Sequence, residues 1–197
     1  HIPAGFVKTL KDPSVNWLFE TEPSWGTNGR SIAAPRGKTL GGSSSINGLV
    51  FNRGQSMDFD TWAQRGNQGW GYADILPYFK RYETRLGNGS PVYRGQAGEQ
   101  VITDLEWRHP LCDAFIQAAT DMGIPLNEDY NGVIQEGISY VQRTSKGRLR
   151  HSAAKSFLNP IKSRKNLHII THAHTTSLII EKGRANGVAF SRGGRHG

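Results

Sequence analysis

The spacing of apolar residues predicts two helices in the first half of this chain. Phe59 and Trp62 follow at helical spacing just after Asp58, which we expect to be the N-cap of the first helix. The second helix is predicted over 72–84, where apolar residues recur every three or four positions. Pro77 falls inside this range, and we expect it in the first turn, where a missing N–H is tolerated.

A third helix is predicted to begin at Pro110 and to end before Gly123. Cys112 lies on this helix, and we interpret it as a core residue rather than a nucleophile. The apolar residues that repeat at helical spacing here are Leu111, Phe115, Ala118 and Met122.

Alternating and β-branched stretches predict strands over 101–105, 138–143, 167–171, 177–181 and 187–190. The last two are expected to be joined by a turn at 183–186. A short helix is predicted over 152–161, whereas 1–35 is expected to be extended or irregular and 87–99 to be a glycine-rich loop. The whole pattern predicts a mixed α+β fold.

Composition and charge narrow the classes of partner. The chain has 197 residues and a formal net charge of +8, which suits a nucleic-acid partner. The 24 lysines and arginines are scattered, however, without a basic run or a basic strand studded with aromatic residues, so we expect no nucleic-acid partner. The single cysteine, Cys112, cannot form an internal disulfide, which favours a reducing compartment.

No apolar run approaches the length of a membrane span, and no signal peptide opens the chain. We therefore expect no transmembrane segment, and a location in the cytoplasm or at the periphery of the inner membrane. The chain begins His1-Ile2-Pro3 without methionine, as an internal segment of a longer protein would.

The stretch from Arg36 to Gly48, RGKTLGGSSSING, carries the most specific chemistry. Glycines let the backbone approach a ligand, and short polar side chains beside two positive charges suit a phosphate-bearing cofactor with a flat ring system. Neither the dinucleotide fingerprint nor the P-loop spacing is present. A flexible linker is the alternative, but a β-branched stretch and a helix follow at once, which favours a packed fold.

This stretch, followed by Arg53-Gly54 and Trp62, resembles the first signature segment of the glucose–methanol–choline (GMC) family of flavin oxidoreductases. Other segments are similar in order and spacing to the choline and alcohol dehydrogenases of that family, and they extend over nearly the whole chain. They are Asn16-Trp17, Thr21-Glu22-Pro23, Gly69-Trp70-Gly71-Tyr72, Leu76 to Arg81, Asp129-Tyr130-Asn131-Gly132, Gln135-Glu136-Gly137, Gly147-Arg148 with Arg150, and Asn166-Leu167. The Asp129–Gly132 segment is interpreted by itself as a turn without a chemical role.

The resemblance implies that flavin adenine dinucleotide (FAD) is contacted within the glycine-rich stretch. Gly42 and Gly48 allow close backbone approach, and Ser43 can donate to a phosphate. Asn47 can donate and accept hydrogen bonds at the isoalloxazine edge.

Three further positions follow from the same resemblance. Val50 belongs to the FAD contacts, and Thr175 aligns with a position whose backbone meets the adenine in relatives. Some relatives carry a histidine joined covalently to the flavin where this chain has Ile46, so we expect FAD to be bound non-covalently. Packing of Ile46 and Val50 in the core is the alternative interpretation, and both can hold together.

His168, His172 and His174 would share one face if 167–175 were a single strand, as a metal site requires. No acidic or cysteine residue accompanies them nearby, and the resemblance offers no metal. We therefore predict solvated strand histidines and no metal site.

The resemblance also implies how the chain is divided. Residues 1–71 would contact FAD, 72–160 would form part of a sheet-and-helix substrate domain, and 161–197 would return as strands towards the FAD-binding domain. The dinucleotide-binding unit that comes first in the family has no match here, and neither does the C-terminal segment with the catalytic histidine. We therefore assign no catalytic residue and interpret the chain as an internal fragment.

The implied reaction is the FAD-dependent oxidation of choline or another primary alcohol to an aldehyde, by hydride transfer to the flavin, within a longer enzyme. We expect the isolated fragment to be inactive. Two alternatives stay open: a catalytically silent fragment or interaction module, and a hydroxynitrile-lyase-like protein that keeps FAD without net redox change. The alcohol, the electron acceptor and the oligomeric state are left open.

Overall fold

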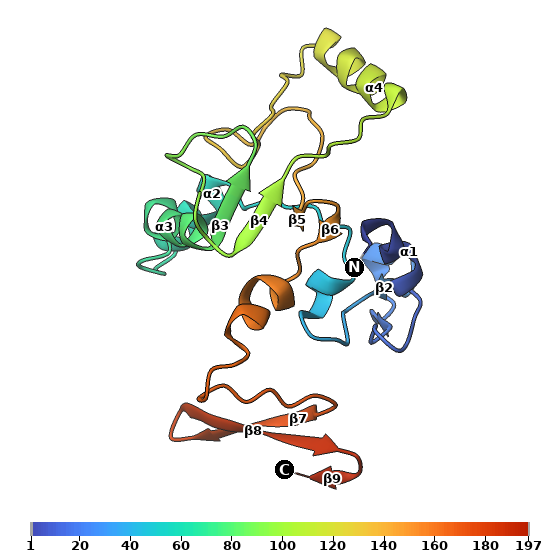
Figure 1. Cartoon of the computed structure of the whole chain (residues 1–197), viewed down its shortest axis with the longest axis vertical. Coiled ribbons are helices and arrows are strands. Elements are labelled where there is room, and N and C mark those ends of the chain that lie inside the picture. The colour runs from blue at the N-terminus through green and yellow to red at the C-terminus, as the bar shows by residue number, and fades with distance from the viewer. Residues whose placement is uncertain (1, 197) are drawn as a thin grey trace. The chain divides into compact units, whose positions relative to one another are not determined.

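The computed structural model describes residues 2–196, which separate into two compact units, up to Pro160 and from Ile161 onward (Figure 1). The first unit mixes helices with short strands, and this mixture confirms the α+β fold class. Its helical elements are α1 (Phe6–Thr9), α2 (Ser56–Gln64), α3 (Tyr72–Tyr82) and α4 (Pro110–Asp121), the 3-10 turns η1 (Pro3–Gly5), η2 (Trp25–Thr27), η3 (Gly42–Ser45) and η5 (Asn159–Ile161), and the π-helix η4 (Ala154–Leu158).

The strands of the first unit are short and pair in twos. They are β1 (Phe19–Glu20) with β2 (Ala33–Ala34), β3 (Glu83–Leu86) with β4 (Gln100–Thr103), and β5 (Ser145–Lys146) with β6 (Leu149–Arg150). The β3–β4 pair is parallel, with Glu83 opposite Gln100, and the other two pairs are antiparallel. The 87–99 segment that connects β3 to β4 forms neither helix nor strand, as predicted.

The interior of the first unit is unusually polar. Its buried apolar side chains are Ile46, Leu49, Val101, Ile102 and Ala119. Buried polar and charged residues outnumber them among the described residues: Asn16, Arg53, Glu83, Arg85, Arg94, Gln100, Asn131, Gln142, Ser145, Arg150, Ser152 and Ser156. Hydrogen bonds and ion pairs, rather than apolar packing alone, therefore hold this unit together.

Two helix predictions need correction. Asp58 is not the N-cap of α2; Gln55 is, and Asp58 lies at the third helical position, where its carboxylate accepts a hydrogen bond from Gln55 N at 2.9 Å. Pro77 lies in the middle of α3 rather than in its first turn. The predicted 72–84 helix ends at Tyr82, because Glu83 is already extended and starts β3.

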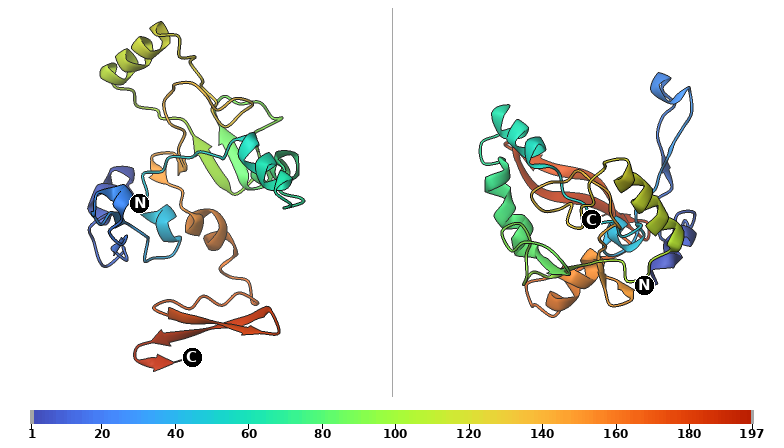
Figure 2. Two further views of the ribbon diagram at one scale, coloured as in Figure 1. Left: turned by 180° about the vertical axis from the view of Figure 1, so that it is seen from behind. Right: turned by 90° about the horizontal axis from the view of Figure 1, so that it is seen from above.

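The predicted third helix is present as α4, which stands away from the β3–β4 sheet in the views of Figures 1 and 2. The large apolar residues of the predicted repeat are exposed, with Leu111 at 73%, Phe115 at 70% and Met122, the C-cap, at 83%, whereas Ala119 is buried. Cys112 is exposed as well, so its interpretation as a core residue is wrong for this chain. Helical spacing predicted the helix correctly but could not say whether a partner covers it.

Several strand predictions are wrong. Residues 138–143 form only isolated bridges, from Ile138 to Leu126 and from Arg143 to Val50 and Thr103. The β5–β6 hairpin after them was not predicted, and it turns at Gly147, where φ is +55°. The predicted 152–161 helix is helical, but as consecutive π and 3-10 turns.

The second unit is built on one antiparallel sheet, in the order β7 (His174–Glu181), β8 (Arg184–Arg192) and β9 (Arg195–His196). The turn between β7 and β8 is Lys182-Gly183, both at positive φ, which is tighter and earlier than the predicted 183–186 turn. No strand forms over 167–171, since regular pairing begins only at His174. Every residue of β7 is exposed.

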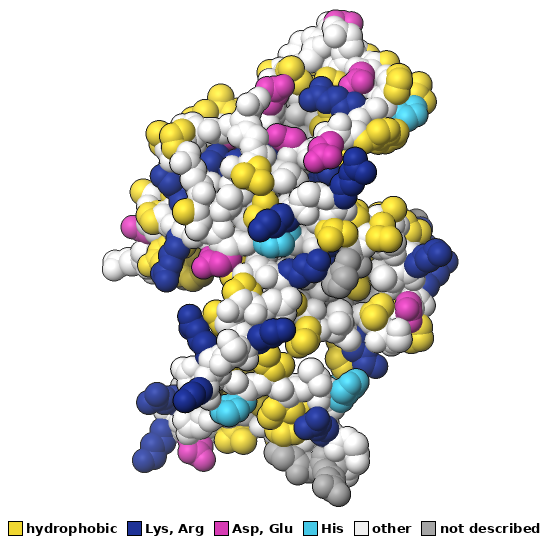
Figure 3. Space-filling view, in the orientation of Figure 1, with side chains coloured by type: hydrophobic (Ala, Val, Ile, Leu, Met, Phe, Trp, Pro, Cys, Tyr) yellow, Lys and Arg dark blue, Asp and Glu magenta, His cyan; other side chains and the backbone are white. Residues whose placement is uncertain are grey.

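Lysine and arginine side chains are dispersed over the face shown in Figure 3, interleaved with acidic and apolar ones. None of the described helices is both long and apolar enough to cross a membrane.

Candidate functional site

The glycine-rich stretch folds into a tight turn around η3. Gly41 precedes η3 with φ +87° and Gly42 opens it with φ +53°, so both adopt the left-handed conformation that glycine favours. An added Cβ on Gly41 would lie 2.6 Å from Ser45 Oγ and 3.1 Å from Ala154 N, whereas one on Gly42 would have no described atom within 4 Å. The chain's own packing therefore requires Gly41, while the space beside Gly42 is open.

Two serine hydroxyls bind the turn internally. Ser43 Oγ accepts a hydrogen bond from Gly37 N at 3.1 Å, and its own hydrogen makes no bond within residues 2–196. Ser44 Oγ donates to Gly41 O at 2.5 Å and accepts from Ala153 N at 2.9 Å. Ser43 is exposed and keeps a donor, whereas the Ser44 hydroxyl hydrogen is already used.

Asn47 follows the turn with its amide oriented by two donors. Its Oδ1 accepts from Leu49 N at 3.1 Å and from Arg150 Nη1 at 2.7 Å. Both partners are donors, so the oxygen must lie on their side, and the Nδ2 group must lie on the other. Asn47 is exposed, and its Nδ2 has no hydrogen-bond partner among the described residues. The amide therefore retains only its donor for a ligand.

Val50 leaves its backbone polar groups unpaired. It forms an antiparallel bridge with Arg143 through the bonds of its neighbours, Phe51 N to Gln142 O and Thr144 N to Leu49 O, each 2.9 Å. In this pattern the N–H and C=O of Val50 itself point away from Arg143. Neither group makes a hydrogen bond within residues 2–196, and the Val50 side chain is 55% exposed.

Gly48 lies between Asn47 and Val50 and is exposed. An added Cβ there would have Phe6, at 4.0 Å, as its nearest described neighbour. The packing of this chain therefore places no restriction on a small side chain at Gly48.

Arg150 holds the turn from beneath, across more than a hundred residues of sequence. Its Nη1 donates to Ser44 O at 3.1 Å and to Asn47 Oδ1 at 2.7 Å, and its Nη2 donates to Asn47 O at 2.6 Å. The side chain is buried, and burial lowers the pKa of its guanidinium. No carboxylate lies within 4.0 Å of it among the described residues, and all three of these acceptors are neutral.

The predicted site residues are thus brought together only in part. Gly42, Ser43, Asn47, Gly48 and Val50 lie in one continuous turn and its exit, and all of them are exposed except Gly42, which is half-buried. Thr175 belongs to the second unit, where it is exposed on β7 opposite Phe190. Ile46, 3% exposed, packs in the core, as the alternative interpretation had it, whereas Val50 does not.

A second buried arginine site joins the chain that leaves this turn to the β3–β4 sheet. The fully buried carboxylate of Glu83 pairs with Arg53 through one oxygen and with Arg94 Nε through the other, at 2.7 Å. Arg94 also pairs with Asp129 and donates to Gln142 Oε1 at 2.9 Å. Two arginines and two carboxylates make this network electrically balanced.

The Asp129–Gly132 segment packs against this network and supplies further hydrogen bonds to it. Asn131 Oδ1 accepts from Arg53 N at 2.7 Å, and Tyr130 Oη donates to Phe51 O at 2.8 Å while accepting from Gln142 N at 2.7 Å. Burial raises the pKa of Tyr130, which keeps the phenol protonated as a donor. The segment is a turn, but it also fixes residues 51–53, a role that its sequence alone did not reveal.

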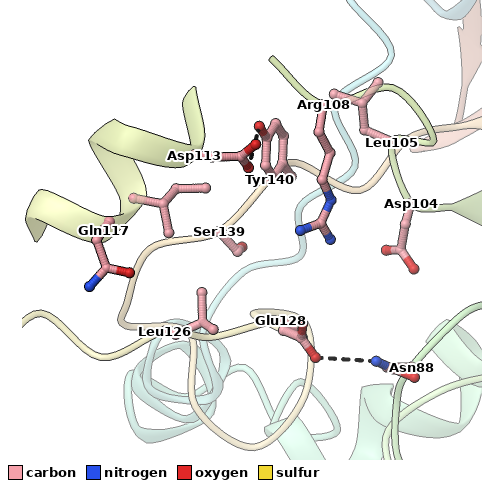
Figure 4. Close-up of a pocket in the computed structure, with 11 residues that line it drawn as sticks. Asn88, Asp104, Leu105, Arg108, Asp113, Gln117, Leu126, Glu128, Ser139 and Tyr140 are labelled. Carbon is pink, nitrogen blue, oxygen red and sulfur yellow. Dashed lines mark hydrogen bonds between the residues drawn. The ribbon is translucent and has the colours of Figure 1, made fainter. Parts of the chain in front are cut away.

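A cavity of about 300 Å³ lies away from the turn, between α4 and the end of β4 (Figure 4). Tyr140 Oη donates to Asp113 at 2.9 Å, Asn88 donates to Glu128 at 3.2 Å, and the Arg108 guanidinium stacks over the Tyr140 ring at 5.1 Å. The carboxylates that line it are therefore already engaged, since Asp104 pairs with Arg85 at 2.5 Å.

The three histidines considered for a metal do not share one strand. His172 has φ +56° and precedes the sheet, whereas His174 opens β7. Among the side chains that the structure describes, no group of three from histidine, cysteine and the acidic residues is placed to hold a metal ion.

Sequence reasoning missed the role of Arg150, although it noted the Gly147-Arg148 and Arg150 segment. A signal was available: an arginine two residues after the Gly147-Arg148 turn needs acceptors if it is buried. The identity of those acceptors, 103 residues earlier for Asn47, could come only from the tertiary structure.

Comparisons with known proteins agree with one another. A sequence model of the GMC oxidoreductase family matches residues 5–197. An oxygen-dependent choline dehydrogenase of Rhizobium meliloti (strain 1021) is 43% identical over 194 residues, covering 98% of this chain and 35% of that protein. An alcohol dehydrogenase [acceptor] of Pseudomonas putida is 39% identical over 196 residues, covering 100% of this chain and 36% of that protein. The chain therefore spans about a third of the length of these curated relatives.

Solved structures show the same fold. Pyridoxine 4-oxidase from Mesorbium loti superposes with a TM-score of 0.90 at 28% identity, over 99% of this chain and 38% of that one. Formate oxidase of Aspergillus oryzae RIB40 superposes with a TM-score of 0.81 at 24% identity, over 99% of this chain and 35% of that one, a likeness of fold alone.

Proposed function

Because the chain belongs to the GMC oxidoreductase family, as its glycine-rich stretch predicted, we propose that it is part of an enzyme that binds FAD and oxidises a primary alcohol, choline or another, to an aldehyde. The named relatives are choline and alcohol dehydrogenases, which supports an alcohol as the substrate. When bound, the flavin would accept the hydride that leaves the alcohol carbon.

The residues of the turn fit a flavin. Asn47 offers an exposed amide donor, Val50 offers an unpaired N–H and C=O, and Gly48 leaves open space beside the backbone. Hydrogen-bonding groups on the flavin ring need such fixed partners, and a ring approaching the backbone needs the absence of a Cβ. In this proposal Gly42, Ser43, Asn47, Gly48 and Val50 contact FAD.

The single observation that carries the proposal is this row of unpartnered exposed donors inside a family-specific segment. Among the described residues, only three buried side-chain polar atoms lack a hydrogen-bond partner, whereas the exposed Nδ2 of Asn47 and the backbone N–H and C=O of Val50 have none. In the same proposal residues 1–71 contact FAD, 72–160 belong to the substrate domain and 161–197, with Thr175, return towards the adenine.

The proposal is tested on the protein expressed from the complete reading frame that contains this chain. We expect a yellow preparation with flavin absorbance that is bleached by a primary alcohol in the absence of an electron acceptor. Choline, a simple primary alcohol and a secondary alcohol distinguish the substrate class. A colourless preparation that does not bind added FAD would contradict the proposal.

We propose further that the flavin is held without a covalent bond, because Ile46 has no nucleophilic atom and its side chain is buried. After acid precipitation the yellow colour should stay in the supernatant. Colour that remains in the protein pellet would overturn this part of the proposal.

A further inference from the structure

Arg150 is the only described side chain that holds both ends of the turn between Ser44 and Asn47. It donates to the backbone oxygens of both residues and to the side-chain oxygen of Asn47, with distances of 2.6–3.1 Å. The planar guanidinium supplies several donors in one fixed fork, an arrangement that lysine cannot reproduce.

The direction of the Asn47 amide depends on this fork. Leu49 N donates to the same oxygen from the local chain and closes an Asx turn, so the local bond and the distant Arg150 together place the oxygen. With Arg150 in place the oxygen faces the interior, and the two hydrogens of Nδ2 remain on the exposed side. The arginine itself is 4% exposed, so it can act on a ligand only through the residues it holds.

We propose, resting on the FAD site proposed above, that Arg150 is the positioning residue of the flavin-contacting turn: it orients Asn47 so that the amide donates to the flavin through Nδ2. The hairpin turn at Gly147 places Arg150 against the residues 44–47, which gives the β5–β6 hairpin a role in cofactor binding through this buried side chain. Loss of Arg150 and loss of the Asn47 donor should then impair the same interaction.

The test measures the dissociation constant of FAD, by fluorescence titration of the apoprotein, and the visible spectrum of the bound flavin, using the complete protein. Asn47→Asp keeps the oxygen that accepts from Arg150 and Leu49 but replaces the donor by an acceptor. We expect FAD to bind roughly tenfold more weakly or worse, with the same circular dichroism and melting temperature or a higher one. Because Asn47 is exposed, this variant remains informative even if Arg150 variants fold poorly.

Arg150→Met and Arg150→Lys complete the test. Both should weaken FAD binding by roughly tenfold and shift the flavin spectrum, because neither can form the fork. In the Asn47→Ala background the further effect of Arg150→Met should be much smaller, since both changes remove one interaction. Arg85→Met is the matched control: Arg85 is buried and donates to two backbone oxygens and a carboxylate, but none of these lies in the turn. It should leave FAD affinity unchanged.

Two results distinguish a failure of the proposed function from a failure of the positioning role of Arg150. Wild-type protein that does not bind FAD overturns the proposed function, and this inference with it. Wild-type protein that binds FAD, together with an Asn47→Asp variant of equal affinity or full rescue by Arg150→Lys, overturns the positioning role alone.

Discussion

Two buried arginine sites in the first unit solve the same physical problem in different ways. Arg53 and Arg94 share the carboxylates of Glu83 and Asp129, so their charges are balanced within the chain. Arg150 donates to neutral oxygens, two from the backbone and one from the side chain of Asn47. A balanced network is complete without a ligand, whereas the Arg150 site ends in an exposed amide donor that has no described partner.

This difference separates polar groups that stabilise the fold from polar groups that are available to a ligand. In the Glu83 network nearly every polar atom has a partner, the exceptions being Arg53 Nε and Arg94 Nη2. At the Asn47 turn the buried side is fully bonded and the exposed side is not. Unpartnered polar groups on a rigidly held turn are what a ligand site needs before its ligand arrives.

Among the variants that test this comparison, Glu83→Gln is expected to lower the free energy of unfolding the most. Removing the shared carboxylate leaves two buried arginine charges without it, and we expect the free energy of unfolding to fall by about 3–5 kcal/mol. Urea unfolding followed by circular dichroism measures this loss. Glu99→Gln, at an exposed position, is the control and should change little. A loss below about 1 kcal/mol would show that the network is not structural.

Gly41→Ala is expected to cause the next largest loss of stability. Its new Cβ meets Ser45 and Ala154, and φ +87° is strained for alanine, so the free energy of unfolding should fall by about 1–3 kcal/mol. Gly48→Ala is the matched variant: it should stay within about 0.5 kcal/mol of wild type yet weaken FAD binding. Thermal unfolding and FAD titration of both variants distinguish packing from ligand approach. Equal destabilisation by the two would contradict the assignment.

Arg150→Met should cost less stability than Glu83→Gln, about 1–2 kcal/mol, because it strands neutral oxygens rather than charges. Arg150→Met should nevertheless weaken FAD binding more than Glu83→Gln does. Measuring both quantities on both variants gives a crossed pattern. If stability and affinity fall in the same order for the two variants, the two arginine sites do not differ in kind.

The smallest effect concerns pH. Burial, with smaller contributions from Lys146 and Lys155, lowers the pKa of His151 from its ordinary 6.5. Its neutral Nδ1 accepts a hydrogen bond from Val101 N at 3.3 Å. Below pH 6.5 the unfolded chain takes up a proton that the folded chain resists, so stability should fall as the pH is lowered through this value. The fall is small because the imidazole is partly exposed.

Urea unfolding at pH 7.5 and at a pH below 6.5 checks this slope, with His151→Gln as the comparison. The difference between the two pH values should be smaller in the variant than in wild type. An unchanged difference would assign the pH dependence to other groups.

The sequence predicted the helices better than the strands. α2, α3 and α4 lie where apolar spacing placed them, since a helix is a local structure with a period of its own. The strands β3, β5 and β6 were missed, because they are two to four residues long and polar, and pair through contacts that a period of two cannot reveal. The prediction that Cys112 lies in the core failed for a related reason. Periodicity shows which residues share a face of a helix, but not whether another element covers that face, and the apolar face of α4 is exposed.

The sequence by itself determined the family and the segment on which its chemistry depends. The glycines Gly41-Gly42 let the backbone approach a ligand, and the serines that follow supply short polar side chains beside it. What only the tertiary structure decided is the state of each polar group in that segment. Asn47 could in principle donate and accept, and the distant Arg150 takes its oxygen and leaves its donor. A hydrogen bond across 103 residues depends on how the chain folds back on itself, and no local pattern encodes that geometry.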